Sequence, residues 1–493
     1  MKKQVFNPFL PLNVCIPDGE PHIFGDRVYL YGSHDKEGGE TFCMLDYTVY
    51  SAPVDDLTDW RCEGVSYRAD QDPDYHTSDR KFMYAPDVVQ GNDGKYYLYY
   101  CMSGRDGVGG YFGPISVAVS DSPAGKFEYL GYVKYPDGSP MQKYVPFDPG
   151  VINDNGTIRI YYGTQYADEY DPEFRNKDWA IKEVMKRFNK SYEEVVNTTE
   201  SVMGPVMLTV EDDMLTVKED AHHIIPYYTP GTSFEDHPFF EASSIRKIGD
   251  TYYFIYSSWQ NHELCYATSK YSDKDFVFGG TIVSNGDIGI NGVEEQNRLN
   301  MTGTTHGSIE NINGQWYVFY HRLTHKSDYS RQACAEKITI NEDGSIDQVE
   351  ITSCGLNDGP LEAKGAYPAG IACNITNGHM PHGCNRIYTD SFPNVTNIGE
   401  DRFIGEICDN TLIGYKYFDF AGCKNVSITT RGKGEGSFKI YTELGGEPVG
   451  EIKVSATNEW TKLTADVNIT DGTHPLYFIY NGTETVDLKE IEF

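Results

Sequence analysis

Hydrophobic and polar positions along this chain repeat one local plan five times. A short strand-like run is followed by a turn of Gly with Asp or Asn, and then by an aromatic-rich run with alternating character. Alternation with a period of two around such turns is the pattern of a β-hairpin. The sequence therefore predicts five hairpins of one design, at residues 17–32, 87–100, 148–162, 241–256 and 306–320.

A polar residue opens each copy, seven or eight positions before its turn glycine. The opening residues are Asp18, Asp87, Asp148, Glu241 and His306, and the glycines are Gly25, Gly94, Gly156, Gly249 and Gly314. In a radial propeller the first strand of every blade runs beside the central axis, so these five residues are expected to meet at one mouth of the channel. A single acid at a strand start is commonly a turn cap. A register shared by five copies instead favours a working site, because clustered carboxylates raise one another's pKa.

The pattern predicts an all-β fold: a five-bladed β-propeller followed by a β-sandwich (jelly-roll-like) domain. The repeat ends after Gly344, and from about residue 361 short strands alternate with Gly, Asn and Asp turns, as in a sandwich. We place the propeller at residues 1–355 and the sandwich at 356–493. The third interval between turn glycines, 249−156 = 93 residues, is long. Apolar residues at helical spacing predict a helical insertion there, at about residues 172–200.

The composition argues against some classes of binding partner. Acidic residues outnumber basic ones by 73 to 41, and the formal net charge of −32 argues against nucleic acid or an anionic membrane as a partner. The first eleven residues lack the apolar core of a signal peptide, and no stretch is long enough to span a bilayer. We therefore expect a cytoplasmic protein. The eleven cysteines lack C-x-x-C spacing and are expected to be reduced thiols.

The ring has the components for hydrolysis of a glycosidic bond. One carboxylic acid protonates the departing oxygen while a carboxylate deprotonates the attacking water, and a third carboxylate can tune the acid. The chain has no Gly-x-Ser-x-Gly, no His-Glu-x-x-His and no phosphate-binding loop. The Asn-Asp-Gly stretches near Gly94 and Gly156 lack the spaced ligands of a calcium loop and indicate turns.

These motifs resemble glycoside hydrolase family 43, whose members are five-bladed propellers that act with inversion on polymers containing arabinose and xylose. The resemblance covers roughly residues 5–340. Its marks are Pro17-Asp18-Gly19, Tyr84-Ala85-Pro86-Asp87, Phe147-Asp148-Pro149, Phe240-Glu241-Ala242-Ser243, His306-Gly307-Ser308 and Arg331-Gln332.

The resemblance implies a role for each matching residue. Asp18 corresponds to the general base, Glu241 to the general acid, and Asp148 to the carboxylate that tunes the acid's pKa and orients it. His306 corresponds to a histidine facing a hydrated metal ion, often calcium, on the propeller axis, and this ion is expected to be structural, not chemical. Arg331 and Tyr84 are the expected substrate-binding residues, although Tyr84 stands where many members have Trp. For Asp87 the resemblance gives no catalytic role; support of the pocket structure is the favoured interpretation, and substrate binding is the alternative.

The C-terminal part resembles a family 6 carbohydrate-binding module, through residues 363–367, 405–420 and 476–493. Such modules stack exposed Trp or Tyr on sugar rings, and some bind a structural calcium ion. Trp460 and Tyr415 are the candidates for stacking. The alternative is a module that has lost sugar binding and supports the propeller.

We therefore predict an inverting exo-acting α-L-arabinofuranosidase that releases arabinose from arabinoxylan or arabinan oligosaccharides. A β-D-xylosidase, or an enzyme with both activities, is the alternative, because both pentoses present similar hydroxyls. A glycoside phosphorylase would need basic residues around the pocket to hold phosphate. A non-catalytic carbohydrate-binding propeller would be expected to lack one of the three acids.

Overall fold

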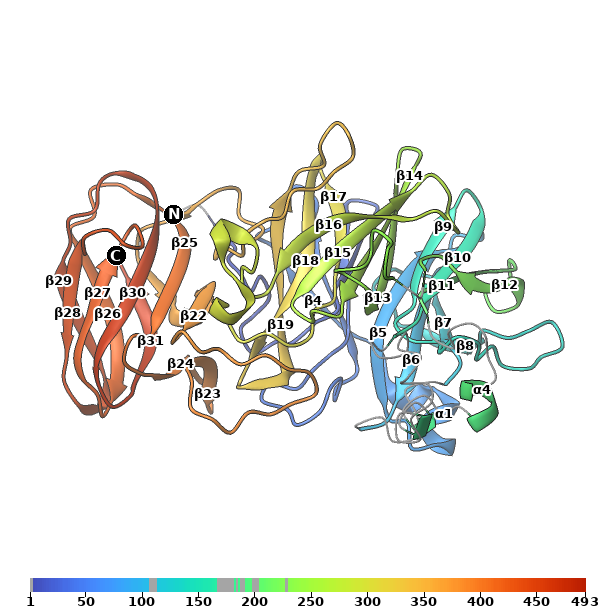
Figure 1. Ribbon diagram of the computed structural model, residues 1–493, viewed down its shortest axis with the longest axis horizontal. Coiled ribbons are helices and arrows are strands. Elements are labelled where there is room, and N and C mark those ends of the chain that lie inside the picture. Colours follow the sequence, from blue (N-terminus) through green and yellow to red (C-terminus); the bar gives the residue numbers. More distant parts are fainter. Residues whose placement is uncertain are drawn as a thin grey trace.

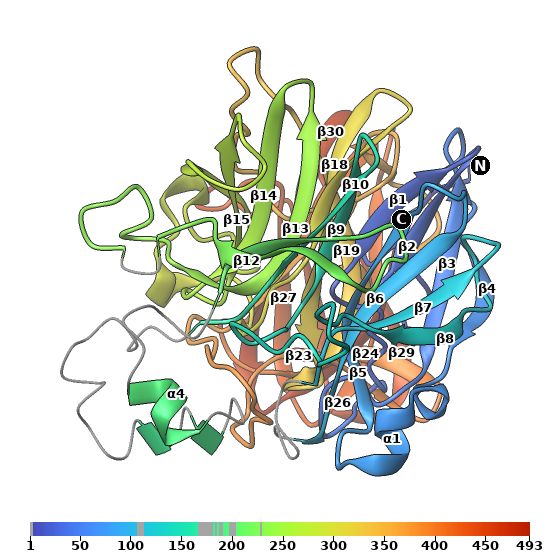
Figure 2. The same cartoon turned by 90° about the vertical axis from the view of Figure 1, so that its right-hand side faces the viewer.

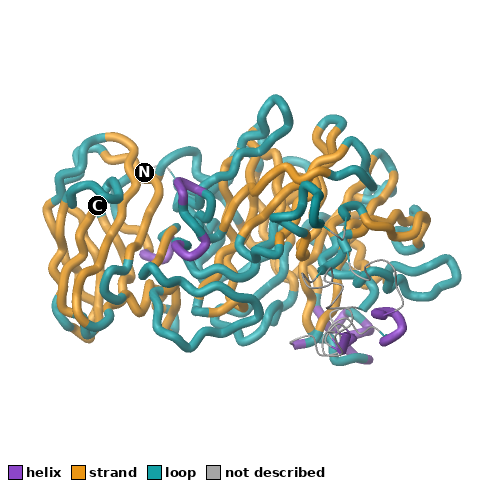
Figure 3. The backbone as a smooth tube through the Cα atoms, viewed as in Figure 1, coloured by secondary structure: helices purple, strands orange, loops and turns teal. Residues whose placement is uncertain are grey.

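The computed structural model describes residues 3–105, 113–165, 181–182, 185–186, 191–196, 204–226 and 229–493. Strands dominate these residues, and helices are few and short (Figure 3). The fold is all-β, as the alternating pattern predicts. The short helices include α1 (Pro73–Thr77) and α4 (Tyr192–Val196). Most of the helical insertion expected at about 172–200 lies outside the described residues.

Five antiparallel sheets follow one another along the described residues from 20 to 338 (Figure 1). Within each sheet, consecutive strands lie side by side. The first two sheets consist of β1 (Glu20–Phe24), β2 (Arg27–Tyr31), β3 (Tyr47–Pro53) and β4 (Arg61–Tyr67), and of β5 (Phe82–Gln90), β6 (Tyr96–Ser103), β7 (Ser116–Ser120) and β8 (Glu128–Tyr132). The third consists of β9 (Gly150–Asp154), β10 (Thr157–Tyr162), β11 (Val206–Val210) and β12 (Val217–His223). The last two consist of β13 (Phe239–Ile248), β14 (Thr251–Ser258), β15 (Glu263–Ser269) and β16 (Val277–Ser284), and of β17 (Ser308–Ile312), β18 (Gln315–Thr324) and β19 (Ser327–Ile338).

The predicted hairpin turns are present where the sequence places them. Asn155 and Gly156 connect β9 to β10 with φ angles of 52° and 92°, and Asn313 and Gly314 connect β17 to β18 with 52° and 89°. A two-residue turn with positive φ at both positions has the twist that matches two antiparallel strands. Asn and Gly are the residues that adopt this conformation at least cost.

The first strands of the five sheets contact one another in cyclic order: β1 with β5, β5 with β9, β9 with β13, β13 with β17, and β17 with β1. A parallel bridge between Gly19 and Gly307 joins the first and fifth sheets. Each pair of neighbouring sheets shares a hydrophobic cluster. Many buried members are tyrosines whose hydroxyl groups are paired; Tyr100, for example, donates a hydrogen bond of 2.6 Å to Asp72.

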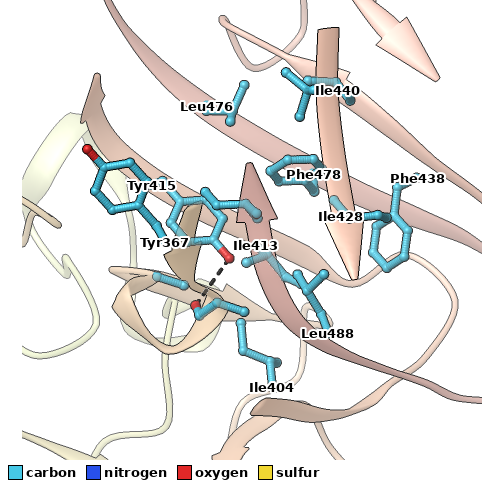
Figure 4. Close-up of a cluster of buried hydrophobic side chains, with 14 of the residues drawn as sticks. Tyr367, Ile404, Ile413, Tyr415, Ile428, Phe438, Ile440, Leu476, Phe478 and Leu488 are labelled. Atoms are coloured by element: carbon cyan, nitrogen blue, oxygen red, sulfur yellow. Dashed lines mark hydrogen bonds between the residues drawn. The ribbon is translucent and has the colours of Figure 1, made fainter. Parts of the chain in front are cut away.

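Two six-stranded sheets form the C-terminal region, at the left of Figure 1 and behind the five sheets in Figure 2. One contains β20 (Leu361–Glu362), β25 (Leu412–Phe420), β30 (Gly472–Thr483), β27 (Glu435–Tyr441) and β28 (Gly450–Val454), with β22 (Asn374–Thr376) on β25. The other contains β23 (Asn394–Ile398), β24 (Asp401–Ile407), β31 (Val486–Glu492), β26 (Asn425–Gly432) and β29 (Thr457–Asp466), with β21 (Ala366–Pro368) on β31. Side chains from both sheets, such as Phe478 and Leu488, share one hydrophobic cluster (Figure 4).

The C-terminal region is docked on the five sheets at several separate places. Lys416, which is buried, pairs with Asp287 at 2.9 Å. Arg402 pairs with Glu37 of the first sheet's connection through two hydrogen bonds of 2.8 and 2.7 Å. Contacts this widely spaced fix the orientation of the C-terminal region, in contrast to a domain joined only by a linker.

Two expectations from composition can be compared with the structure. The eleven cysteines form no disulfide bond, and six of them are buried, as expected for reduced thiols. Among the described residues, no helix has the length and apolar character needed to cross a membrane.

Candidate active site

A cavity of about 310 Å³ lies at the beginning of four of the five first strands. Asp18 and Asp148 precede β1 and β9 by two residues, Glu241 is the third residue of β13, and His306 precedes β17 by two residues. All four line the cavity. The structure therefore brings together four of the five residues of the expected ring.

The backbone at the three acids is unusual. Asp18 has φ of 58° and Asp148 has φ of 46°, and Ala242, directly after Glu241, has φ of 70°. These values lie in the left-handed region, which costs a non-glycine residue on the order of 1 kcal/mol or more. Strain of this kind is concentrated where the structure holds functional groups in place.

Asp18 lies among three nitrogen groups. Its Oδ1 is 2.8 Å from Nη1 of Arg331, 3.4 Å from Nδ1 of His321 and 3.8 Å from Nδ1 of His306. Burial alone would raise the pKa of this carboxyl, but the charge of Arg331, together with the two histidines, outweighs burial and lowers the pKa below its usual value. Asp18 is therefore ionised at neutral pH and suited to accept a proton.

Arg331 is itself held in place from behind. Its Nε and Nη2 bind the two carboxylate oxygens of Asp35 at 2.8 and 3.1 Å, and its guanidinium lies 4.7 Å from the centre of the Phe42 ring. Bidentate pairing fixes the plane of a guanidinium. Arg331 thus lines the cavity as expected, and its position beside Asp18 shows that it also acts on the carboxylate, which the sequence did not predict.

Asp148 has the opposite electrostatic character to Asp18. It is 5 % exposed, and its Oδ2 accepts a hydrogen bond of 3.2 Å from the backbone N–H of Ala242. Burial and the neighbouring carboxylates of Glu241 and Asp18 raise the pKa of Asp148 well above its usual value. The pair of Asp148 and Glu241 therefore retains a proton at a pH at which isolated carboxyls have lost theirs.

His306 lies between the acids, with Nδ1 3.7 Å from Asp148 and 3.8 Å from Asp18. Burial lowers the pKa of this imidazole to about 4, so the ring is neutral at pH 7. Burial and the charge of Arg331 likewise lower the pKa of His321 to about 3. Among the described residues that line the cavity, Arg331 is consequently the one that carries a full positive charge beside the acids.

Aromatic side chains form the sides of the cavity. Tyr84, which the sequence assigned to substrate binding, lines it, with its ring centre 5.7 Å from that of Phe147 and 6.4 Å from that of Phe42. Trp259 of the connection between β14 and β15 also lines the cavity. Apolar walls with a few polar groups are typical of small-molecule sites.

Asp87 lies away from this cavity, so its assignment to substrate binding is not supported by its position. It is fully buried, and its carboxylate accepts hydrogen bonds from the backbone N–H of Val151 at 2.7 Å and pairs with Nε2 of His22 at 2.6 Å. The physical reason is its place in the strand. Asp87 is the sixth residue of β5, which begins at Phe82, whereas Asp18 and Asp148 precede their strands and Glu241 is only the third residue of β13.

Clusters of potential metal ligands among the described residues bear on the calcium ion that is expected near His306. The described groups with three close potential ligands do not include His306, but one of them joins Glu20, His22 and Asp87. Here Arg246 already supplies a positive charge, 3.1 Å from Glu20. This cluster therefore is not a cage of oxygen ligands of the kind that calcium prefers. The ion expected near His306 is a hydrated one that needs no such cage, and the calcium site stays a prediction.

Several cavity residues were not predicted from the sequence. They are Phe42, Thr164, Trp259, Asn261, Thr304, Thr305, His321, Cys384 and Asn385. Two polar atoms among them, Asn261 Oδ1 and Thr305 Oγ1, are buried and have no hydrogen-bond partner within the described part of the chain. His321 follows the aromatic run inside β18, which is a weak signal for function. Cys384 and Asn385 belong to the C-terminal region, and no local pattern marks them.

The two candidates for sugar stacking in the C-terminal region differ in exposure, because Trp460 is half-buried and Tyr415 is closed to solvent. Tyr415 is wholly buried, and its hydroxyl donates to the carbonyl of Ala369 (Figure 4), so its interpretation as a stacking residue is wrong. The guanidinium of Arg431 lies 4.2 Å from the ring of Trp460, and the Phe403 ring lies edge-on to the same indole. These contacts cover part of the indole, and sugar binding by Trp460 stays a prediction.

An all-β chain with three acids around one cavity has the components of a glycoside hydrolase. The sequence profile described as Glycosyl hydrolases family 43 matches residues 7–346, and the chain belongs to this family. It is 45 % identical to a protein named Xylosidase/arabinosidase from Thermoclostridium stercorarium, over 99 % of this chain and 98 % of that protein.

Two further comparisons are more distant. The chain is 24 % identical to an Arabinoxylan arabinofuranohydrolase from Paenibacillus polymyxa, over 95 % of this chain and 71 % of that protein. The crystal structure of a family 43 β-xylosidase/α-arabinofuranosidase from a compost microbial metagenome, in complex with xylotriose, matches with a TM-score of 0.51 and 26 % identity, over 69 % of this chain and 96 % of that one. The membership predicted from the acid motifs is confirmed.

Proposed function

We propose that this protein is an inverting, exo-acting α-L-arabinofuranosidase that releases arabinose from arabinoxylan or arabinan oligosaccharides. The observation that carries the proposal is the electrostatic contrast in one cavity. Asp18 is held ionised by Arg331, while the Asp148–Glu241 pair retains a proton. β-D-xylosidase activity is the second candidate, because the name of the relative that is 45 % identical joins both activities.

The proposed mechanism uses each acid once. Glu241, the less buried member of the protonated pair, gives its proton to the departing oxygen of the glycosidic bond. Asp18 takes a proton from the water that attacks the anomeric carbon from the opposite side, which inverts the configuration. Asp148 supplies the neighbouring charge that favours a protonated pair. Each proton transfer contributes roughly 10² to 10⁴ in rate.

The proposal includes the architecture inferred from the sequence. We take the five sheets as the blades of a β-propeller, because their first strands contact one another in a closed cycle and each neighbouring pair shares a core. We take residues 356–493 as a β-sandwich domain, because two six-stranded sheets share one hydrophobic cluster. In this arrangement the cavity lies at one mouth of the propeller axis.

The charge around the cavity argues against a phosphorylase. Arg331 is the single Lys or Arg among the described residues that line it, and Asp18 and Asp35 already bind its guanidinium. A phosphate ion would need cationic groups that these carboxylates leave available. The three retained acids likewise argue against a binding protein without activity.

Proton NMR during digestion of an arabinose-substituted xylo-oligosaccharide tests the proposal. We expect free arabinose, with the inverted anomer appearing before mutarotation. Release of xylose from an unsubstituted chain would support β-D-xylosidase activity, with the same three acids in the same roles. Release of the retained anomer would contradict the proposed mechanism, and a sugar phosphate formed only with added phosphate would contradict hydrolysis.

A further inference from the structure

One side of the cavity is supplied by a part of the chain that lies beyond the family match. The match ends at residue 346, yet Cys384 and Asn385 line the same cavity as the three acids. Both belong to the stretch between β22 and β23. We call residues 380–392 the outer segment.

Backbone hydrogen bonds attach the outer segment to the five-sheet region. The N–H of Thr302 donates to Pro381 at 3.1 Å, and the N–H of Tyr388 donates to Lys326 at 2.8 Å. Asp328 and Arg386 are joined twice, through the Asp328 N–H at 3.1 Å and through the Arg386 N–H at 3.0 Å to the Asp328 carboxylate. The outer segment is therefore held at both of its sides.

Packing also attaches the outer segment to the five-sheet region. Met380 and Phe392, at its two ends, share a small hydrophobic cluster with Met301. A side chain at Gly303 would come within 2.4 Å of the carbonyl oxygen of Gly383. The outer segment therefore lies at backbone contact distance from the connection that carries Thr304, Thr305 and His306 into the cavity.

The outer segment is attached to the fifth sheet at a place further from Asp18 than Arg331 is. It pairs with Lys326 and Asp328 at the β18–β19 turn, while Arg331, which binds Asp18, is three residues further along β19, about 10 Å of extended strand. The exposure of the side chains agrees with this order. Asp18, Asp148 and Arg331 are almost fully buried, whereas Asn385 is exposed. A sugar whose anomeric carbon reaches the acids would extend its leaving group toward Asn385.

We propose that the outer segment forms the binding site for the sugar unit on the leaving-group side of the cleaved bond, with Asn385 as its specificity-determining residue. The proposal rests on the proposed glycosidase function. A carboxamide both donates and accepts hydrogen bonds, as a sugar hydroxyl does. Asn261 and Thr305, which line the same cavity, add further polar side chains to its wall.

The test compares two substrates that share the released sugar. One is an oligosaccharide, and the other is the p-nitrophenyl glycoside of the same pentose, which has no leaving-group sugar. We expect Asn385→Ala to lower kcat/KM for the oligosaccharide about ten-fold more than kcat/KM for the aryl glycoside, as for the loss of one or two hydrogen bonds to a substrate. Failure of the wild-type enzyme on both substrates would instead contradict the proposed function.

Backbone strain needs its own control, because Asn385 has φ of 60°. Asn385→Gly removes the side chain and tolerates this angle, so it should change the ratio of the two kcat/KM values as Asn385→Ala does. Asn410, also exposed in the C-terminal region with φ of 62°, is the matched control, and Asn410→Ala should leave the ratio within two-fold. An unchanged ratio in both Asn385 variants, or a normal ratio in Asn385→Gly alone, would overturn the proposal.

Cys384 gives a second measurement that does not depend on turnover. Cys384 lines the cavity next to Asn385 and is partly exposed, so bound oligosaccharide should slow its alkylation by a maleimide, which peptide mass spectrometry locates. Cys62, which is exposed in the first sheet, is the internal reference. Equal alkylation of Cys384 with and without saturating oligosaccharide would contradict a binding site at the outer segment.

Discussion

The inner and outer parts of the cavity are built in different ways. The inner part, with Asp18, Asp148 and His306, comes from residues just before the first strands of the sheets, at fixed distances from turn glycines. The outer part comes from the outer segment, which belongs to the C-terminal region and follows no repeat. The groups that are proposed to act on the glycosidic bond are thus placed by the repeated hairpins. The contact that is proposed for the leaving group is placed by the outer segment, which lies outside the repeat.

The difference teaches how such a fold can vary its substrate while keeping its chemistry. The acids are buried and are held by strained backbone and by Arg331, so a change among them disturbs several neighbours at once. Asn385 is exposed on a connection between strands, where side chains change at lower cost. The predictions below separate the two parts, beginning with the largest effect.

Asp18→Asn should lower kcat/KM by roughly 10² to 10⁴ on both the oligosaccharide and the aryl glycoside, because water must be deprotonated whatever the leaving group. Asn tolerates the left-handed backbone at this position. Asp26→Asn, in the exposed turn after β1, is the matched control and should retain full activity. Steady-state kinetics with a thermal melt checks this, and a loss below ten-fold would remove Asp18 from the role of base.

Glu241→Gln should lower kcat/KM by different factors for the oligosaccharide and for the aryl glycoside. We expect a loss of roughly 10² to 10⁴ on the oligosaccharide, whose departing oxygen needs a proton, and a much smaller loss on an aryl glycoside with a good leaving group. The ratio of kcat/KM values therefore changes in the same direction as for Asn385→Ala, but by a larger factor. Equal losses on both substrates would contradict the assignment of Glu241 as general acid.

Arg331→Met should shift the acidic limb of the pH profile of kcat/KM. Arg331 lowers the pKa of Asp18, so its removal raises that pKa, and activity is then lost at a higher pH as the solution is acidified. We expect a shift of about one unit or more. Arg331→Lys keeps the charge and should shift less, and an unchanged acidic limb in a folded Arg331→Met protein would contradict the role of the pair.

Trp460→Ala tests whether the C-terminal region binds sugar through this indole. Because Arg431 and Phe403 pack against the ring, we expect no change in retention on insoluble xylan and a stability loss of about 1 kcal/mol from the lost cation–π and aromatic contacts. Affinity electrophoresis and thermal melting measure the two effects. Loss of retention without loss of stability would restore Trp460 as a sugar-stacking residue.

Much of the fold could be read from local pattern. The turns at Gly156 and Gly314 and the aromatic strands after them are present as predicted, because hairpin turns and alternation are short-range properties. The buried position of Tyr415 could not be read in this way. Alternation shows that one face of a strand is buried, but not which face, and Tyr415 lies on the inner one.

The sequence by itself determined the all-β class, the five hairpins and the common position of Asp18, Asp148, Glu241 and His306, because each depends on residues close together in the chain. Only the tertiary structure decided that Asp87 lies inside its strand, that Arg331 sets the charge state of Asp18, and that Asn385 reaches the same cavity. These facts depend on contacts between residues that are far apart in the chain, 313 positions in the case of Arg331 and Asp18. The spacing of residues along a chain does not predict such contacts, because only tertiary packing brings the partners together.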